Sequence, residues 1–188
     1  MNNPDACTGF SISGSTRRLF TFSASPADTF AFYRDIGRSL GFLPHITVVQ
    51  KFTLDQYRLV YRAKESAMLQ VSIFCDVLAE ADAQQRCIRI LPLPGMAPVQ
   101  SKVRLNEIIC HGYYTSEIVF NELGDQTQAD ISLEIQAELP KPPALRWLPH
   151  ALLSGAAQNI FLLRLDEVIN GFIDQSRLAY SGGGNKKP

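Results

Sequence analysis

The chain has 188 residues, of which 46% are hydrophobic and 19% are charged, and its formal net charge is +0. This length fits one domain, and this composition excludes a largely disordered chain, which would combine few apolar residues with a large net charge. The neutral balance argues against nucleic acid as the main partner, because phosphate binding requires a basic face. No apolar run approaches the ~20 residues of a membrane-spanning helix, so no transmembrane segment is expected.

The two ends of the chain are predicted to be disordered, and the middle to form one domain. Residues 1–15 are polar, and the tail 181–188 is rich in Gly and Lys. Neither segment buries enough apolar surface to offset the entropy that ordering costs. Residues 16–180 contain no repeat and no low-complexity linker. Residues 1–16 also lack the apolar stretch of a secretory signal, which predicts a cytoplasmic protein.

The first predicted elements are a strand at residues 18–23 and the helix that follows it. The strand is rich in Leu and Phe, which favour a partly buried, pleated surface. Ser25 suits the N-cap of the helix, Pro26 its first position, and Asp28 the positive end of its dipole. Gly41 is the predicted end of this helix, because Leu-Pro follows closely and disfavours its continuation.

A run of strands follows, with no helix between them. We expect strands at residues 46–54, 57–63, 68–79, 86–91, 99–110, 113–123 and 127–139. In the third and the last of these, apolar and polar residues alternate at a period of two, which is typical of a sheet with one buried face. The apolar faces consist of Leu69, Val71, Ile73, Cys75 and Val77 in one strand and Ile131, Leu133, Ile135 and Ala137 in the other. Because parallel pairing needs crossover helices, the sheet is predicted to be antiparallel.

The last predicted element is a long helix after the proline-rich segment 140–143. It begins near residue 144 or 151 and runs to 179, and its apolar residues recur at steps of three and four. The residues of this apolar face are Leu162, Leu165, Val168, Ile169, Phe172 and Ile173. The predicted fold class is therefore α+β, with a curved antiparallel sheet of about seven strands around a long C-terminal helix and a short helix after the first strand.

This order of elements resembles the START-like superfamily, which includes polyketide cyclases, plant pollen-allergen proteins and lipid-transfer domains. The resemblance rests on the strand that leads directly into a helix at residues 23–36, on the run of strands, and on the helical segment 159–173. It covers residues 17–178. The resemblance implies a helix-grip fold that encloses an apolar cavity between the sheet and the last helix.

A narrower resemblance rests on three short proline-containing segments. Leu43-Pro44-His45, Leu139-Pro140-Lys141-Pro142 and Leu148-Pro149-His150 are similar to segments of an uncharacterised family of cyanobacteria and plastids. That family carries no known activity. Membership would imply a photosynthetic source and a cytoplasmic or stromal location.

The expected partner is a hydrophobic small molecule, such as a lipid, an isoprenoid or a pigment, held in the cavity without any cofactor. Small residues on the strands and the last helix leave room for it, and these are Ala63, Ala67, Ala137, Ala156 and Ala157. The residues expected to line the cavity are Phe30, Tyr33, Phe42, Tyr61, Val71, Ile73, Ile118, Phe120, Leu133, Ile135, Trp147, Leu165 and Ile169. Large aromatic side chains among them can also fill that space.

Residues 111–117 contain the candidates for catalysis, which are His111, Tyr114 and Glu117. Because successive residues of a strand point to opposite faces, Glu117 shares one face with Tyr113, and Tyr114 shares the other with Ile118. If the first face points inward, Glu117 is a buried carboxylate whose raised pKa suits general acid or base catalysis. If the second face does, Glu117 is a solvent-facing charge. The sequence leaves both orientations open.

Metal and disulfide sites are not expected. The chain has three histidines, His45, His111 and His150, and none has a carboxylate at metal-ligand spacing. Its four cysteines, at positions 7, 75, 87 and 110, form no C-x-x-C pair, which predicts reduced thiols in the cytoplasm. Trp147 is interpreted chiefly as a core residue at the start of the last helix, and otherwise as a side chain that contacts a membrane surface or a partner.

Three functions remain open at this point, and the oligomeric state is not determined. The first is binding or transport of a hydrophobic molecule in the cavity, and the second is a cyclase or hydrolase that uses the same cavity. The third is an assembly factor with a filled core that acts through its surface. A cavity without polar groups favours binding, convergence of Glu, His and Tyr favours catalysis, and a solid interior favours the third function.

Overall fold

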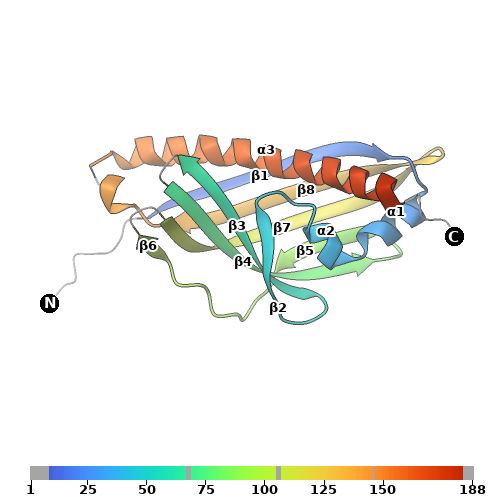
Figure 1. Ribbon diagram of the computed structural model, residues 1–188, viewed down its shortest axis with the longest axis horizontal. Coiled ribbons are helices and arrows are strands. Elements are labelled where there is room, and N and C mark those ends of the chain that lie inside the picture. The colour runs from blue at the N-terminus through green and yellow to red at the C-terminus, as the bar shows by residue number, and fades with distance from the viewer. Residues whose placement is uncertain (1–8, 67–68, 105–106, 146, 184–188) are drawn as a thin grey trace.

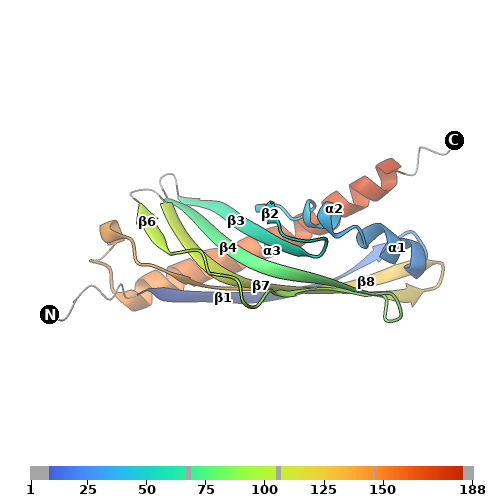
Figure 2. The same ribbon diagram turned by 90° about the horizontal axis from the view of Figure 1, so that it is seen from below.

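The computed structural model describes residues 9–66, 69–104, 107–145 and 147–183. In chain order its elements are β1 (Phe10–Phe22), α1 (Pro26–Tyr33), α2 (Ile36–Leu40), β2 (Ile46–Lys51), β3 (Gln56–Ser66), β4 (Leu69–Asp82), β5 (Cys87–Pro92), β6 (Lys102–Arg104), β7 (Glu107–Leu123), β8 (Gln126–Leu139), the 3-10 turn η1 (Pro143–Leu145) and α3 (His150–Gly183). The strands form one curved sheet, and α3 lies across one side of it (Figure 1, Figure 2).

The eight strands of the sheet follow the order β1-β8-β7-β5-β4-β3-β2, with β6 beside β7. The pairing is antiparallel, as predicted, except where the first part of β4 runs parallel to the first part of β7. This exception arises because β5 is only six residues long and separates β4 from β7 farther along both strands. The predicted fold class, a curved antiparallel sheet with a long C-terminal helix, is confirmed.

The first strand is longer than the sequence predicted. β1 pairs with β8 from Phe10, opposite Leu139, to Phe22, opposite Thr127. The prediction that residues 10–15 are disordered is therefore wrong, because an edge of β8 supplies their backbone hydrogen bonds. At the other end, α3 runs to Gly183, so residues 181–183 are helical rather than part of a disordered tail. Residues 1–8 and 184–188 lie outside the described residues.

The helical segment after β1 is divided in two, although one helix was predicted. The Ser25 side chain accepts a hydrogen bond from the Asp28 backbone N–H at 3.2 Å, which caps α1 as expected. Asp35 then caps α2 by accepting a hydrogen bond from the Arg38 N–H, also at 3.2 Å. The second cap starts a new helix in a different direction, and Gly41 ends it, as predicted.

The predicted strands 99–110 and 113–123 also differ from the structure. β7 runs without a break from Glu107 to Leu123, and residues 93–101 form an extended connection that is not part of the sheet. This connection crosses the face of the sheet that α3 leaves uncovered. It is held there by hydrogen bonds from the Leu93 N–H to the Asp76 carbonyl at 2.8 Å and from the Arg58 guanidinium to the Ala97 carbonyl at 3.3 Å.

The interior lies between the concave face of the sheet and α3. The apolar faces predicted for β4 and β8 point into it, with Ile73 fully buried and Ile135 1% exposed. From α3, the buried side chains are Phe161, Leu165, Val168, Ile169, Phe172 and Ile173. Burial of these two sets against each other is the main source of the stability of the fold, because it removes a continuous apolar surface from water.

Two glycines let α3 approach its neighbours closely. A Cβ atom at Gly14 of β1 would stand 2.5 Å from the Leu165 Cδ1 atom, and one at Gly171 of α3 would stand 2.6 Å from the Pro44 Cγ atom. Side chains of α3 also bind the outer edge of β1. The Gln158 amide exchanges hydrogen bonds with the Ser13 backbone, and the Arg177 guanidinium donates to the Thr21 carbonyl at 3.0 Å. The helix therefore covers an edge strand that would otherwise expose unpaired backbone groups.

Candidate ligand-binding cavity

An apolar cavity of about 190 Å³ lies between the first half of α3 and the strand ends beneath it. From α3 and the connection before it, the lining residues are Pro142, Leu145, Leu153, Ala156, Ala157, Ile160 and Phe161. From the strands, they are Phe10, Ile12, Tyr61, Leu69, Val71, Ile73, Ile108 and Leu139. Tyr61 contributes the only polar side-chain atom of this lining. The arrangement can hold an apolar molecule but offers it almost no hydrogen bonds.

The second half of the interior is filled by aromatic rings. The ring centroid of Tyr33 lies 5.3 Å from that of Phe120 and 5.7 Å from that of Phe172. The rings that complete this cluster are Phe22, Phe30, Phe32, Phe42 and Tyr180. A void of only about 40 Å³ remains nearby, which is far below the volume of a drug-sized ligand. The cavity is therefore confined to the end of the sheet where α3 begins.

The residues predicted to bind the ligand are divided between these regions. Tyr61, Val71 and Ile73 line the cavity, as do Ala156 and Ala157, which were expected to leave room for a ligand. Tyr33 and Ile118 border only the small void. The remaining core residues of the prediction line neither space, and these are Phe30, Phe42, Phe120, Leu133, Ile135, Leu165 and Ile169. They pack the core instead.

Several lining residues were not predicted. Phe10 and Ile12 were assigned to a disordered end, although their alternation with Ser11 and Ser13 already fits a strand with one buried face. Leu153, Ile160 and Phe161 belong to α3 but lie nearer its start than the apolar face that the sequence marked. Ala67, named as a small residue, lies outside the described residues.

The prediction that Trp147 is a core or ligand-binding residue is wrong. This side chain is 78% exposed and does not belong to the cavity lining. It lies in the connection between η1 and α3. The reason is geometric, because η1 and Pro142 already close that end of the cavity.

The three candidates for catalysis do not converge. Tyr114 points into the interior, is 2% exposed, and makes a side-chain hydrogen bond with Ser116, while burial raises its pKa. Glu117 points to the opposite face of the sheet, where its carboxylate accepts a hydrogen bond from Arg89 at 2.7 Å and 43% of the side chain is exposed. The possibility that Glu117 is a buried carboxylate is excluded by this geometry, since alternation along β7 places Tyr114 inward.

His111 also lies on the outer face, on the opposite side of the sheet from the cavity. Its Nδ1 atom is buried and has no hydrogen-bond partner, and burial lowers its pKa from the ordinary value of 6.5. Near it, the Asp76 carboxylate, whose side chain is only 2% exposed, accepts two hydrogen bonds from Arg58, at 2.6 and 2.9 Å. Of these groups, the Arg58 side chain holds the 93–101 connection to the sheet through its hydrogen bond to the Ala97 carbonyl.

The other two histidines are not cavity residues either. The His45 Nε2 atom lies 3.7 Å from the Glu167 carboxylate of α3. His150 is the first residue of α3, and its Nε2 atom lies 3.3 Å from the Gly9 carbonyl oxygen. In the ranges that the structure describes, no group of three or more His, Cys, Asp or Glu side chains gathers closely enough to hold a metal ion. Within those ranges, no helix combines the length and apolar character needed to cross a bilayer.

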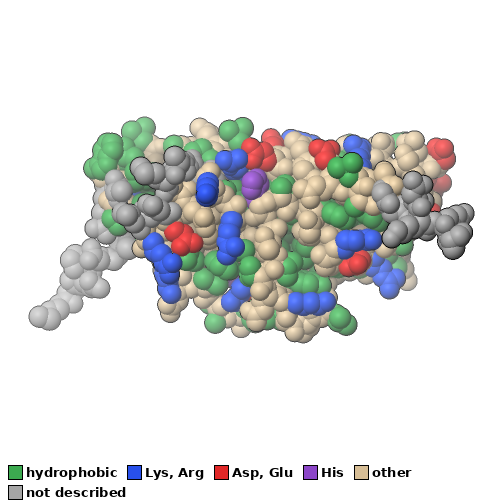
Figure 3. Space-filling view, in the orientation of Figure 1, with side chains coloured by type: hydrophobic (Ala, Val, Ile, Leu, Met, Phe, Trp, Pro, Cys, Tyr) green, Lys and Arg blue, Asp and Glu red, His purple; other side chains and the backbone are tan. Residues whose placement is uncertain are grey.

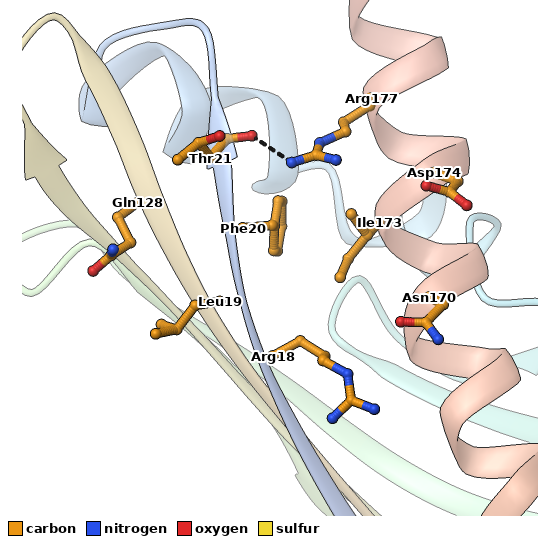
Figure 4. A pocket seen from close by; sticks show the side chains of 9 residues that line it. All are labelled: Arg18, Leu19, Phe20, Thr21, Gln128, Asn170, Ile173, Asp174 and Arg177. Carbon is orange, nitrogen blue, oxygen red and sulfur yellow. Dashed lines mark hydrogen bonds between the residues drawn. The ribbon is translucent and has the colours of Figure 1, made fainter.

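A polar groove of about 580 Å³ runs between β1 and α3, on the outside of the molecule (Figure 4). Its two arginines are engaged by the protein itself. Arg18 pairs with Asp166 at 2.8 Å, and Arg177 donates to the Thr21 carbonyl, the bond drawn in Figure 4. Asp174 adds a negative charge to the same groove. The groove therefore carries positive and negative charges together, and its arginines are already paired within the protein.

The described cysteines are unsuited to nucleophilic chemistry. Burial raises the pKa of Cys75 and Cys110 to about 12, and burial beside Glu117 raises that of Cys87 to about 11. At neutral pH we therefore expect iodoacetamide to modify none of the three in the native protein and all of them in urea. Mass spectrometry of the alkylated chain measures this, and rapid native labelling of Cys75 or Cys110 would contradict their burial.

The same thiols give stability a dependence on pH. In the unfolded chain they ionise near the ordinary pKa of 9.0, whereas the folded protein holds them protonated to about 11 or 12. The unfolded state therefore loses protons first, and the free energy of unfolding is expected to fall as the pH rises above about 9.

Comparison with known proteins is informative at the level of structure only. No protein-family model and no curated protein matches the chain. TTHA0849 from Thermus thermophilus is similar, with a TM-score of 0.50 and 16% identity, over 88% of this chain and 99% of that one. A conserved protein from Geobacillus kaustophilus has a TM-score of 0.51 and 10% identity, over 91% and 96% of the two chains.

StfQ, a di-domain ARO/CYC protein of the steffimycin biosynthetic pathway, is also similar, with a TM-score of 0.51 and 11% identity. The match covers 92% of this chain and 52% of StfQ. At these identities the likeness shows the fold alone, a curved antiparallel sheet with a long C-terminal helix, which is the predicted helix-grip fold. The narrower resemblance to a cyanobacterial and plastid family gains no support from these matches.

Proposed function

We propose that this protein binds or carries a small hydrophobic molecule in the cavity beneath the first half of α3. The observation that supports this function is the cavity lining, in which fourteen apolar side chains surround the single hydroxyl of Tyr61. An apolar lining selects ligands by burial and shape rather than by hydrogen bonds. A cytoplasmic or stromal location, predicted from the sequence, is part of this proposal.

The size of the cavity narrows the class of ligand. A volume of about 190 Å³ is smaller than the ~300 Å³ of a typical drug-sized site. The ligand is therefore a compact apolar molecule, or a larger lipid or isoprenoid of which only one chain end enters. Tyr61 can orient a ligand that carries one polar group, since its hydroxyl both donates and accepts hydrogen bonds.

The enzyme alternative is not favoured by this geometry. It named Glu117, His111 or Tyr114 as a residue acting on a ligand in the cavity, and none of the three belongs to the cavity lining. The alternative of a filled core fits only the aromatic half of the interior. Similarity to an ARO/CYC protein extends to the fold and adds no catalytic residue to this chain.

Replacing Ala157 by Trp is expected to abolish binding of an apolar fluorescent probe, because the indole ring would occupy the cavity that Ala157 lines. We expect the wild-type protein to bind N-phenylnaphthylamine with micromolar affinity and the Ala157→Trp variant to bind it at least about tenfold more weakly. Fluorescence titration measures both affinities.

The matched control is Ala179→Trp, which places the same ring on an exposed position of the same helix, far from the cavity. This variant should bind the probe like the wild type, and circular dichroism should show all three proteins folded. Equal binding by the Ala157 and Ala179 variants, or no binding by the wild type, would remove the support for a ligand in this cavity.

A further inference from the structure

Several large apolar side chains are exposed where α3 begins. Leu152, Ile160 and Leu163 are 65%, 38% and 68% exposed, and together with Ala156 they follow one another at steps of four, four and three residues. Residues at these steps share one face of a helix. We call these four residues the rim stripe. Trp147, in the connection before the helix, adds the most exposed large aromatic side chain of the described chain at 78%.

The rim stripe borders the ligand cavity. Ala156 and Ile160 belong both to the stripe and to the cavity lining, so the exposed apolar surface continues into the apolar interior. Figure 3 shows hydrophobic side chains gathered at the end of the molecule where α3 begins, with Lys and Arg side chains on the same half of this face. A molecule that enters the cavity from this side would contact apolar side chains from the protein surface to the cavity interior.

Basic side chains occur on the strands at the same end. Lys64 lies near the end of β3, and Lys102 and Arg104 lie on β6, which pairs with β7 beside the cavity residue Ile108. All three are exposed. Arg104 has Glu107 at 3.6 Å, whereas Lys64 and Lys102 have no carboxylate within ion-pairing distance in the described part of the chain. Lys64 and Lys102 thus place two exposed positive charges on the strands at this end.

We propose that Trp147 and the rim stripe dock on an anionic lipid membrane, with the mouth of the cavity against the bilayer. This inference rests on the proposed function. Transfer of exposed Trp and Leu side chains from water into the interfacial region of a bilayer lowers the free energy. Neighbouring Lys and Arg side chains are attracted to the anionic headgroups. An apolar ligand is poorly soluble in water, so contact of the cavity mouth with a bilayer gives it a route that avoids water.

Docking on a membrane accounts for these features together better than docking on a second protein. Affinity between proteins depends on close shape complementarity and paired polar groups at the rim of the contact. Here the exposed apolar residues form a narrow helical stripe that ends in one projecting Trp, flanked by basic residues. A fluid bilayer accommodates such a surface without a matching shape.

The test is flotation of the full chain with vesicles of phosphatidylcholine alone and with vesicles that also contain phosphatidylserine. The wild-type protein is expected to bind the anionic vesicles, and more weakly as salt is added, because salt screens charge attraction. The double variant Leu152→Ser, Leu163→Ser is expected to bind them at least about tenfold more weakly, since two large apolar side chains no longer leave water. The matched control, Leu178→Ser, changes a residue of the same helix that is 73% exposed at its other end, and should bind like the wild type.

Charge is tested separately from burial. The variant Lys64→Glu, Lys102→Glu is expected to lose about tenfold in binding to anionic vesicles, whereas Lys51→Glu, on β2, should not. Wild-type protein that fails to float with anionic vesicles at low salt, or equal binding by the Leu152/Leu163 and Leu178 variants, would overturn the proposal. A wild-type dimer that the Leu152/Leu163 variant dissociates, without vesicle binding, would also overturn it and assign the stripe to a second copy of the chain.

Probe binding in solution separates this inference from the proposed function. Leu152 and Leu163 do not line the cavity, so their double variant should bind N-phenylnaphthylamine like the wild type. Ala157→Trp should lose the probe but still float with vesicles. Vesicle binding without any probe binding would support membrane docking and contradict the carrier function, and the converse result would do the opposite.

Discussion

Phe172→Asp is expected to lower the free energy of unfolding by about 4 kcal/mol or more. Phe172 is 6% exposed and packs in the aromatic half of the interior, with its ring centroid 5.7 Å from Tyr33 and 6.3 Å from Phe42. The substitution removes a large apolar side chain and places a carboxylate among buried aromatic rings, where losing its hydration is costly. Thermal unfolding followed by circular dichroism should show a midpoint lower by roughly 10 °C.

The control for this prediction is Leu178→Asp, on the same helix. Leu178 is 73% exposed, so the new carboxylate stays in water and the midpoint should change little. A variant at Phe172 that is too unstable to purify agrees with the prediction when the Leu178 variant purifies normally. Similar midpoints for the two variants would show that the aromatic cluster does not hold α3 to the sheet.

The ion pair between Arg58 and Asp76 gives the second large effect. Asp76→Ala is expected to cost about 3 kcal/mol, because the Asp76 side chain is 2% exposed and its loss leaves the Arg58 guanidinium, 21% exposed, without its charge partner. The hydrogen bond that Arg58 donates to the Asp76 carboxylate also raises the pKa of Arg58. Urea unfolding at neutral pH measures the change.

Two further variants identify the cause of that change. Arg58→Met combined with Asp76→Leu should recover most of the stability, since an apolar pair needs no charge partner. Arg17→Ala breaks a comparable cross-strand pair with Asp130, but the Arg17 side chain is 71% exposed, so its loss should hardly move the midpoint. If Asp76→Ala were as mild as Arg17→Ala, the buried pair would not be what holds the 93–101 connection against the sheet.

The elements and the fold class could be predicted from local patterns. Alternation of apolar and polar residues in β4 and β8 identifies strands with one buried face, and the three- and four-residue steps from Leu165 to Ile173 identify the buried face of α3. Leu162, which the sequence placed on the same face, is 42% exposed. These signals can be read from the sequence alone. When one side of a strand or helix is buried, its apolar residues recur with the period of that strand or helix. The same logic applied to Phe10 and Ile12 would also have found the start of β1.

The location and lining of the candidate site could be determined only from the tertiary structure. Alternation in β7 divides Tyr114 and Glu117 between two faces, but only pairing with β8 and β4 determines which face meets α3. Likewise, the sequence names the large aromatic residues without saying where they gather. They fill the half of the interior beneath the end of α3, and small residues such as Ala156 and Ala157 leave the other half open. The exposure of Trp147 has the same origin, because burial of a side chain depends on how distant segments pack around it, and 78% of this side chain stays exposed.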